Sequence, residues 1–158
     1  MNRFAKHIRY PDCLFRILCL LYLFFMNVNA MAFCDTIGDP NRYPTIEREY
    51  FSSEYVLEGK VLSKKNISSP DDPIGYIATL YAVKPTRIFK GKKNTKLIIY
   101  SENTSSRFPM KIGETYIIFL QTSNDGLFVD NCGNSGILKN SPDVIKKIIV
   151  LSNNQKAR

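Results

Sequence analysis

The stretch Gly75–Gly91, GYIATLYAVKPTRIFKG, is the longest strand-like run in the 158-residue chain and decides its fold. It is rich in β-branched and aromatic residues, which suit a pleated and half-buried surface. It is long enough to bend and to serve two parts of one sheet. Pro85 cannot donate to a strand ladder, so the ladder must be interrupted there or lie at an edge. We therefore expect a sheet built around one long, bent strand.

Four shorter segments alternate or run apolar between turn-forming residues, and they complete the predicted strands: Tyr55–Leu62, Leu97–Tyr100, Thr115–Leu120 and Leu127–Asp130. Gly59 inside the first of them indicates a bulge or a sharp bend. Thr115–Leu120 is the most continuously apolar, so we expect both of its faces to be buried. The polar, proline-bearing segment Ser63–Pro73 predicts a surface loop.

Two helices are expected at the ends of this strand region. Pro44–Phe51 has a proline near its start and acidic residues in its first turns, which is typical of a short helix. Ser141 and Pro142 supply an N-cap and a first helical residue for a C-terminal amphipathic helix. The polar tail 152–158 is expected to fray. The pattern predicts a mainly β fold, either a five-stranded antiparallel barrel of the OB type or a β-sandwich.

Residues 1–32 have the layout of a secretory signal peptide. A basic flank precedes the apolar run Ile17–Met26, and small residues offer cleavage after Ala30 or Ala32. A membrane anchor needs about 20 apolar residues, whereas this run ends at Asn27. An uncleaved anchor and a buried core helix are the alternatives. We expect an exported chain, secreted or periplasmic, with no stable membrane span after cleavage.

Removal of the signal changes the chemistry that is available. Lys plus Arg falls from 22 to 18 and Asp plus Glu from 14 to 13, so the formal net charge falls from +8 to +5. The one histidine, His7, is lost as well. A chain without histidine cannot run Ser-His or Cys-His nucleophilic catalysis and lacks the commonest metal ligand. We expect no catalytic, cofactor or metal site and no enzyme activity.

A hydrolase that works without histidine is the remaining enzymatic alternative. Asp71 with Asp72, or Asp125 with Asp130, could pair as acid and base, as carboxylates do in glycosidases. Both pairs lie in or beside predicted turns, where aspartate is common for local reasons.

Cys34 and Cys132 are the two cysteines left after the signal is removed. An even pair in an exported chain predicts one disulfide, and two unpaired thiols are the alternative. Closing so long a loop would stabilise the fold by roughly 4 to 5 kcal/mol in the chain-entropy model.

A basic cluster surrounds the end of the long strand and the turn after it, comprising Lys84, Arg87, Lys90, Lys92, Lys93 and Lys96. OB barrels bind nucleic acid with such residues. An exported protein rarely meets nucleic acid, so the cluster favours an acidic cell-surface or envelope partner. The alternative is a charged turn that keeps a sheet edge soluble.

The order of several motifs resembles a known family. These motifs are Cys34 after the signal, Tyr55–Val61, Tyr81–Val83 leading to Ile88–Gly91, Gly113–Phe119 and Asn131–Gly133. From Cys34 to Gly136 the chain resembles the secreted TIMP-like and netrin-module-like proteins of the tissue inhibitor of metalloproteinases superfamily. The resemblance implies an OB-type barrel for the domain 33–151.

The same resemblance implies an exported binding module that acts on a protein or envelope partner without chemistry of its own. Its candidate partner-binding residues are Cys34, Asp35, Lys90, Lys92 and Lys93. A metallopeptidase inhibitor is the alternative, because family inhibitors chelate zinc through the amine and carbonyl of a first cysteine. Either expected cleavage leaves a residue ahead of Cys34, and this residue would convert that amine into an amide.

We predict that the exported protein, kept oxidised, shows no free thiol to a labelling reagent, because pairing of Cys34 with Cys132 consumes both thiols. Labelling after unfolding, with and without reductant, checks this by mass spectrometry. Two labelled thiols without reductant would refute the disulfide.

Overall fold

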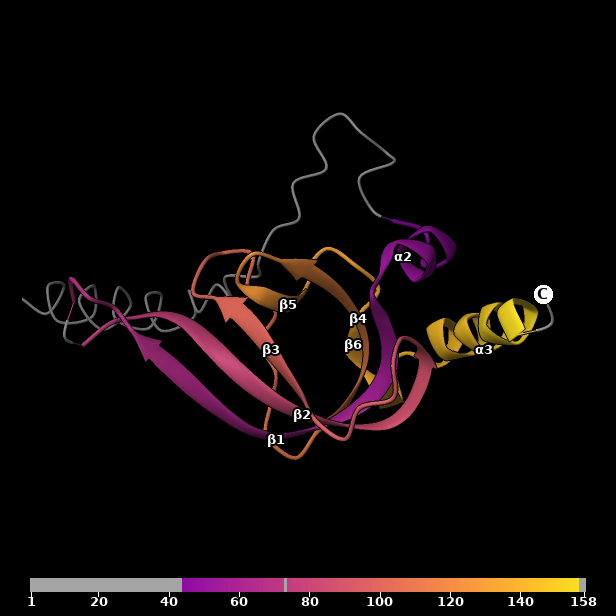
Figure 1. The fold of residues 1–158 in the computed structure, drawn as a ribbon, viewed down its shortest axis with the longest axis horizontal. Helices are drawn as coiled ribbons and strands as arrows, with labels where there is room; N and C mark the ends of the chain where they lie inside the picture. The colour runs from indigo at the N-terminus through magenta and orange to yellow at the C-terminus, as the bar shows by residue number, and fades with distance from the viewer. Residues whose placement is uncertain (1–43, 73, 157–158) are drawn as a thin grey trace, which may run out of the picture. The chain divides into compact units, whose positions relative to one another are not determined.

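The computed structural model describes residues 44–72 and 74–156, and this part of the chain contains one six-stranded sheet with a helix at each end (Figure 1). The strands are β1 Tyr55–Ser68, β2 Tyr76–Lys90, β3 Leu97–Glu102, β4 Thr115–Ser123, β5 Gly126–Val129 and β6 Gly136–Ile137. The mainly β prediction is confirmed. The predicted signal peptide, Cys34 and Asp35 lie outside the described residues.

Five of the strands close into a ring in the order β1-β2-β3-β5-β4, because β4 also pairs with β1. All neighbours are antiparallel except β3 and β5, which run parallel and meet at Ile99 and Leu127. The short strand β6 pairs with the beginning of β4, at Tyr116 and Ile117. The ring brings β3 beside β5 although β4 separates them in the sequence.

β2 is the long strand that the sequence predicts, and it serves two neighbours. It pairs with β1 from Lys90 back to Tyr76, and with β3 only over Ala78–Val83. Pro85 lies beyond the part that pairs with β3, where the missing N–H costs no ladder bond on that side. The register with β1 shifts between Glu58 and Gly59, which confirms the predicted irregularity at Gly59.

The predicted surface loop Ser63–Pro73 is wrong for its first half. β1 continues through Ser68, and residues such as Lys64 and Asn66 pair with β2 across the strand. Most of these side chains are exposed, so their polarity reflects the lack of a covering layer and does not indicate a loop. Over this stretch β1 pairs with β2 alone and is an edge of the described sheet, and the ends of β1 and β2 reach beyond the end of β3 (Figure 1).

Two apolar clusters hold the fold together. One fills the ring with side chains such as Leu57, Val83, Ile99 and Ile118. The other lies between the ring and the helices, and its buried members are Tyr50, Val56, Phe89, Ile117, Phe119 and Ile148. β4 contributes alternate residues to both clusters, which confirms the prediction that both of its faces are buried.

Within the described residues, the α-helices are α2, Ile46–Ser52, and α3, Pro142–Lys156. Thr45 caps α2 by accepting a hydrogen bond from the Arg48 N–H at 3.2 Å. The segment expected to fray is helical through Lys156, and it is held by contacts. The Ser152 hydroxyl is buried and donates to the Phe89 carbonyl, and Gln155 accepts from the Tyr50 hydroxyl at 3.0 Å.

Gly91 at the end of β2 provides a test of this packing. Its φ is +104°, and a Cβ there would collide with the Tyr55 ring. Gly113 has a φ of +86° with nothing within 4 Å of its Cβ position. We expect Gly113→Ala to cost about 1 to 2 kcal/mol of unfolding free energy through backbone strain alone. Gly91→Ala should cost about 1 to 3 kcal/mol more through overpacking.

Urea unfolding of both variants measures the difference between these two costs. Equal losses for Gly91→Ala and Gly113→Ala would contradict the packing of Gly91 against Tyr55.

Candidate functional site

A basic surface lies on the solvent side of β1 and β2 and on the turn that follows β2. We define it by five exposed side chains: Lys60, Lys84, Arg87, Lys92 and Lys93. Lys60 and Lys84 are direct register partners across the antiparallel pair. Like charges placed opposite each other in this way destabilise a sheet. The fold therefore tolerates a local electrostatic cost at this surface.

An open depression lies within the basic surface. It has a volume of about 400 Å³ and is lined by Pro85, Thr86, Arg87, Ile88, Gly91, Lys93 and Asn94. The Arg87 guanidinium lies 4.6 Å from the centre of the Phe89 ring, so the aromatic face holds it in place. Two cationic groups thus border a recess that exposes polar backbone and amide groups.

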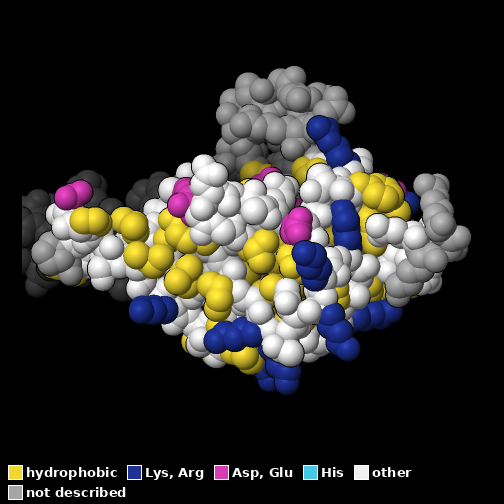
Figure 2. All heavy atoms as spheres, in the orientation of Figure 1, with side chains coloured by type: hydrophobic (Ala, Val, Ile, Leu, Met, Phe, Trp, Pro, Cys, Tyr) yellow, Lys and Arg dark blue, Asp and Glu magenta, His cyan; other side chains and the backbone are white. Residues whose placement is uncertain are grey.

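The cations of the basic surface are not neutralised by the described residues. Within residues 44–72 and 74–156, the ion pairs are Lys146 with Asp143 and Lys147 with Glu47, both at α3. Glu58 is the register partner of Arg87 but forms no ion pair with it. Figure 2 shows Lys and Arg side chains along the lower margin of the face in view, with few acidic groups among them.

Lys90 plays a different part from its neighbours Lys92 and Lys93. Its ammonium donates hydrogen bonds to the carbonyls of Tyr50 and Phe51, at 2.9 and 2.7 Å. It thereby caps the C-terminal end of α2, where a cation is favoured by the helix dipole. Burial lowers the pKa of the Lys90 ammonium, and the charge of Glu54 opposes that shift. Lys92 and Lys93 are exposed, as a partner-binding role requires.

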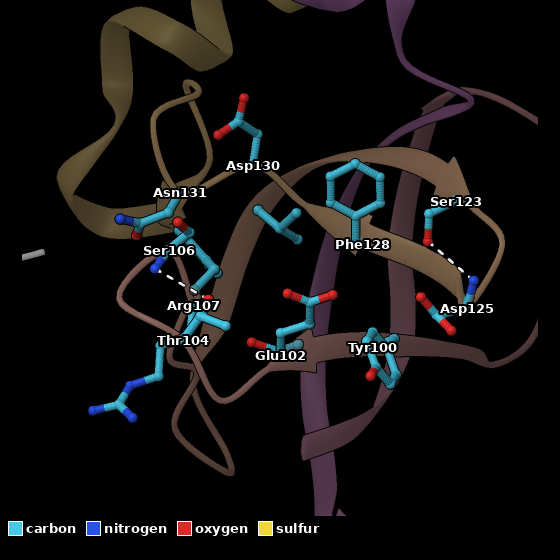
Figure 3. Close-up of a pocket in the computed structure, with 13 residues that line it drawn as sticks. Tyr100, Glu102, Thr104, Ser106, Arg107, Ser123, Asp125, Phe128, Asp130 and Asn131 are labelled. Carbon is cyan, nitrogen blue, oxygen red and sulfur yellow. Dashed lines mark hydrogen bonds between the residues drawn. The ribbon is translucent and has the colours of Figure 1, made fainter. Parts of the chain in front are cut away.

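A second recess, the hollow, opens where β3 and β5 diverge beyond their single paired position (Figure 3). Its volume is about 250 Å³, and aromatic and charged side chains line it. The residues used below are Tyr100, Glu102, Arg107, Asp125, Phe128 and Asp130. Figure 3 shows the Glu102 carboxylate pointing into the hollow below the Phe128 ring.

The hollow is electronegative in spite of the basic sequence. The pKa of the Tyr100 hydroxyl is raised by desolvation and then by the charges of Asp125 and Glu102. The Arg107 guanidinium donates to the Asn103 side chain at 2.7 Å and points away from the hollow (Figure 3). The Arg107 guanidinium therefore does not neutralise the carboxylates that line the hollow.

The aspartates considered as acid and base are not arranged as pairs. Asp125 and Asp130 line the same hollow from different sides, and their carboxylates do not point toward each other (Figure 3). One Asp130 oxygen accepts a hydrogen bond from the Cys132 N–H at 2.9 Å. Asp72 accepts from the Ile74 N–H at 3.0 Å, which is the local turn bond expected of aspartate.

A buried carboxylate that sequence reasoning missed joins α2 to the loop after β5. Glu49 is 1% exposed, and its Oε2 accepts two hydrogen bonds at 2.6 Å, from the N–H and the side-chain amide of Asn134. Its Oε1 has no hydrogen-bond partner among the described residues and lies against Gly133. The spacing of three residues from Ile46 could have indicated that Glu49 faces the core.

In the described part of the chain, no three or more His, Cys, Asp or Glu side chains are grouped so that they could hold a metal ion. The same residues include no helix long and apolar enough to cross a membrane. Comparison with family models and with curated proteins finds no match for this chain.

The pH dependence of stability tests the environment of Glu49. Desolvation raises the pKa of this carboxyl, the Asp130 charge adds to the shift, and the Asn134 hydrogen bonds oppose it. The folded state then binds this proton more tightly than the unfolded state. The stabilisation from Glu49 is full below the ordinary pKa of a glutamic acid and is lost as the pH rises through the raised pKa.

We expect Glu49→Gln to remove this loss of unfolding free energy between acidic and neutral pH, because glutamine does not titrate and can still accept from Asn134. Denaturant unfolding over a pH series measures the effect. Asp71→Asn, at an exposed position in the turn between β1 and β2, is the control for the loss of one carboxyl group. An unchanged pH profile for Glu49→Gln would contradict the raised pKa.

Proposed function

We propose that the chain is an exported binding module of the OB type that holds an acidic protein or envelope partner on its basic surface. Chemistry by the module itself has no part in this proposal. The contact is made by Lys60, Lys84, Arg87, Lys92 and Lys93 around the depression beside β2.

The juxtaposition of Lys60 and Lys84 is the observation that carries the proposal. Like charges at directly paired strand positions cost stability, and neither lysine forms an ion pair with a described residue that would offset this cost. An anionic partner would supply the missing counter-charge. Sites that break a local rule of stability in this way are where function is expected.

The strand order supports the OB-type assignment. Five strands close into a ring through the non-sequential pairs β3–β5 and β1–β4, as a Greek-key barrel requires. The resemblance of residues Cys34–Gly136 to TIMP-like and netrin-module-like proteins points to the same fold.

The chemistry of the surface favours carboxylate groups over single-stranded nucleic acid. Binding of single strands relies on exposed aromatic rings that stack on successive bases. Phe89, the aromatic residue beside the depression, is buried and has Arg87 across its ring. The recess thus offers cations and polar groups without a stacking platform.

Binding of the purified exported protein to polyglutamate, measured by calorimetry over a salt series, tests the proposal. We expect Lys84→Glu combined with Lys93→Glu to weaken binding by about tenfold or more, because reversal turns attraction into repulsion. Lys139→Glu combined with Lys146→Glu makes the same change of net charge outside the basic surface. This control should weaken binding by no more than about twofold.

Two outcomes would overturn the proposal. Equal weakening by the two double variants would mean that only the net charge matters. Tighter binding of a single-stranded DNA oligonucleotide than of polyglutamate, at matched charge and salt, would assign the surface to nucleic acid instead.

A further inference from the structure

The hollow between β3 and β5 is a site of opposite character to the basic surface, and it shares no residue with that surface. Three carboxylates line it, from Glu102, Asp125 and Asp130, against one guanidinium, from Arg107. The Arg107 guanidinium is bound to Asn103 and points outward, so it is not available to the carboxylates. Within the described residues, the carboxylates of this recess therefore have no cationic partner.

Two of these carboxylates can still accept hydrogen bonds from a ligand. The side chains of Glu102 and Asp125 form no ion pair or hydrogen bond with any residue in 44–72 or 74–156. The backbone N–H of Asp125 is bonded to the Ser123 hydroxyl at 3.2 Å, which orders the turn and leaves the carboxylate unengaged. Both residues line the hollow together with Tyr100.

Aromatic walls complete the recess. Tyr100 comes from β3 and Phe128 from β5, and Figure 3 shows the Glu102 carboxylate between them. An aromatic face attracts an organic cation, and the attraction grows as the cation loses water. Carboxylates and rings around one cavity are the chemistry that recognises an ammonium or a guanidinium group.

A metal ion fits this recess less well. Hard divalent cations take six or more oxygen ligands at short range, whereas the described residues show no group of three acidic or other ligand side chains suited to a metal. The apolar parts of Tyr100, Phe108, Phe128 and Val129 also line the hollow, and they favour the carbon stem of an organic cation.

We propose that the hollow binds an organic cation, an ammonium or guanidinium group, between Glu102 and Asp125 with its stem against Tyr100 and Phe128. The cation can come from a lysine or arginine side chain of a protein partner or from a free polyamine. The proposal is independent of the basic surface, so either can fail without the other.

Chemical-shift titration of the ¹⁵N-labelled, purified exported protein tests the proposal. The probes are a short acetylated peptide amide with lysine between glycines, the same peptide with norleucine in place of lysine, and spermidine. We expect the lysine peptide, but not the norleucine peptide, to shift the amide signals of Tyr100, Glu102 and Phe128. The affinity should fall as salt is added, because screening weakens the ionic contact.

Glu102→Gln combined with Asp125→Asn should weaken this binding by about tenfold or more, since both charged acceptors are removed. Glu54→Gln combined with Asp71→Asn makes the same change of net charge at exposed positions elsewhere and should leave binding within about twofold. The spectrum of each variant away from the hollow shows whether it is folded. The salt series on the unaltered protein tests the ionic contact even if a variant does not fold.

The relative affinities of spermidine and the lysine peptide assign the source of the cation. Equal binding of the norleucine peptide, no shift at the hollow with either cation, or unchanged affinity in the Glu102→Gln, Asp125→Asn protein would each overturn the proposal.

Discussion

Pairing of β1 with two partners is the constraint on which the rest of the structure depends. Residues Tyr55–Lys60 pair with β4 on one side, and the strand pairs with β2 on the other, so this segment closes the ring. Gly59 allows the closure because a Cβ there would lie 2.5 Å from Val83 and 2.8 Å from Leu57. Closure places one apolar cluster inside the ring and leaves a second on its outside for the helices.

Local pattern was enough to predict the elements whose residues are buried. β2, β4 and both helices can be predicted from periodicity and capping, because the spacing of apolar residues within each element shows which of its positions are buried. The hollow could not be predicted in this way. Tyr100 and Phe128 come together through the parallel contact of β3 with β5, which no local pattern encodes. An acid in the first turn of a helix, such as Glu49, is expected to face solvent at the helix end, although the helical spacing of Glu49 from Ile46 indicates the buried face.

Positive and negative side chains gather at different places on this protein, which its net charge does not reveal. Lys60 and Lys84 share one face of the sheet, whereas Glu102 and Asp125 border the hollow. Lys90 belongs to the same stretch of sequence as Lys92 and Lys93 but serves the end of α2. Cations adjacent in the sequence thus divide between a structural and an exposed role, and the hydrogen bonds of each ammonium distinguish the two.

The C-terminal end of β1 also affects whether one molecule can pair with another through its sheet edge. Beyond Val61 this strand pairs with β2 alone among the described residues, so one row of its backbone groups has no partner strand within 44–72 and 74–156. Natural sheets protect such edges with charged side chains, lysine above all. Lys64 and Lys65 stand on this edge and are exposed. The polarity that makes Ser63–Ser68 resemble a loop is therefore what keeps this edge of β1 from pairing with a strand of a second sheet.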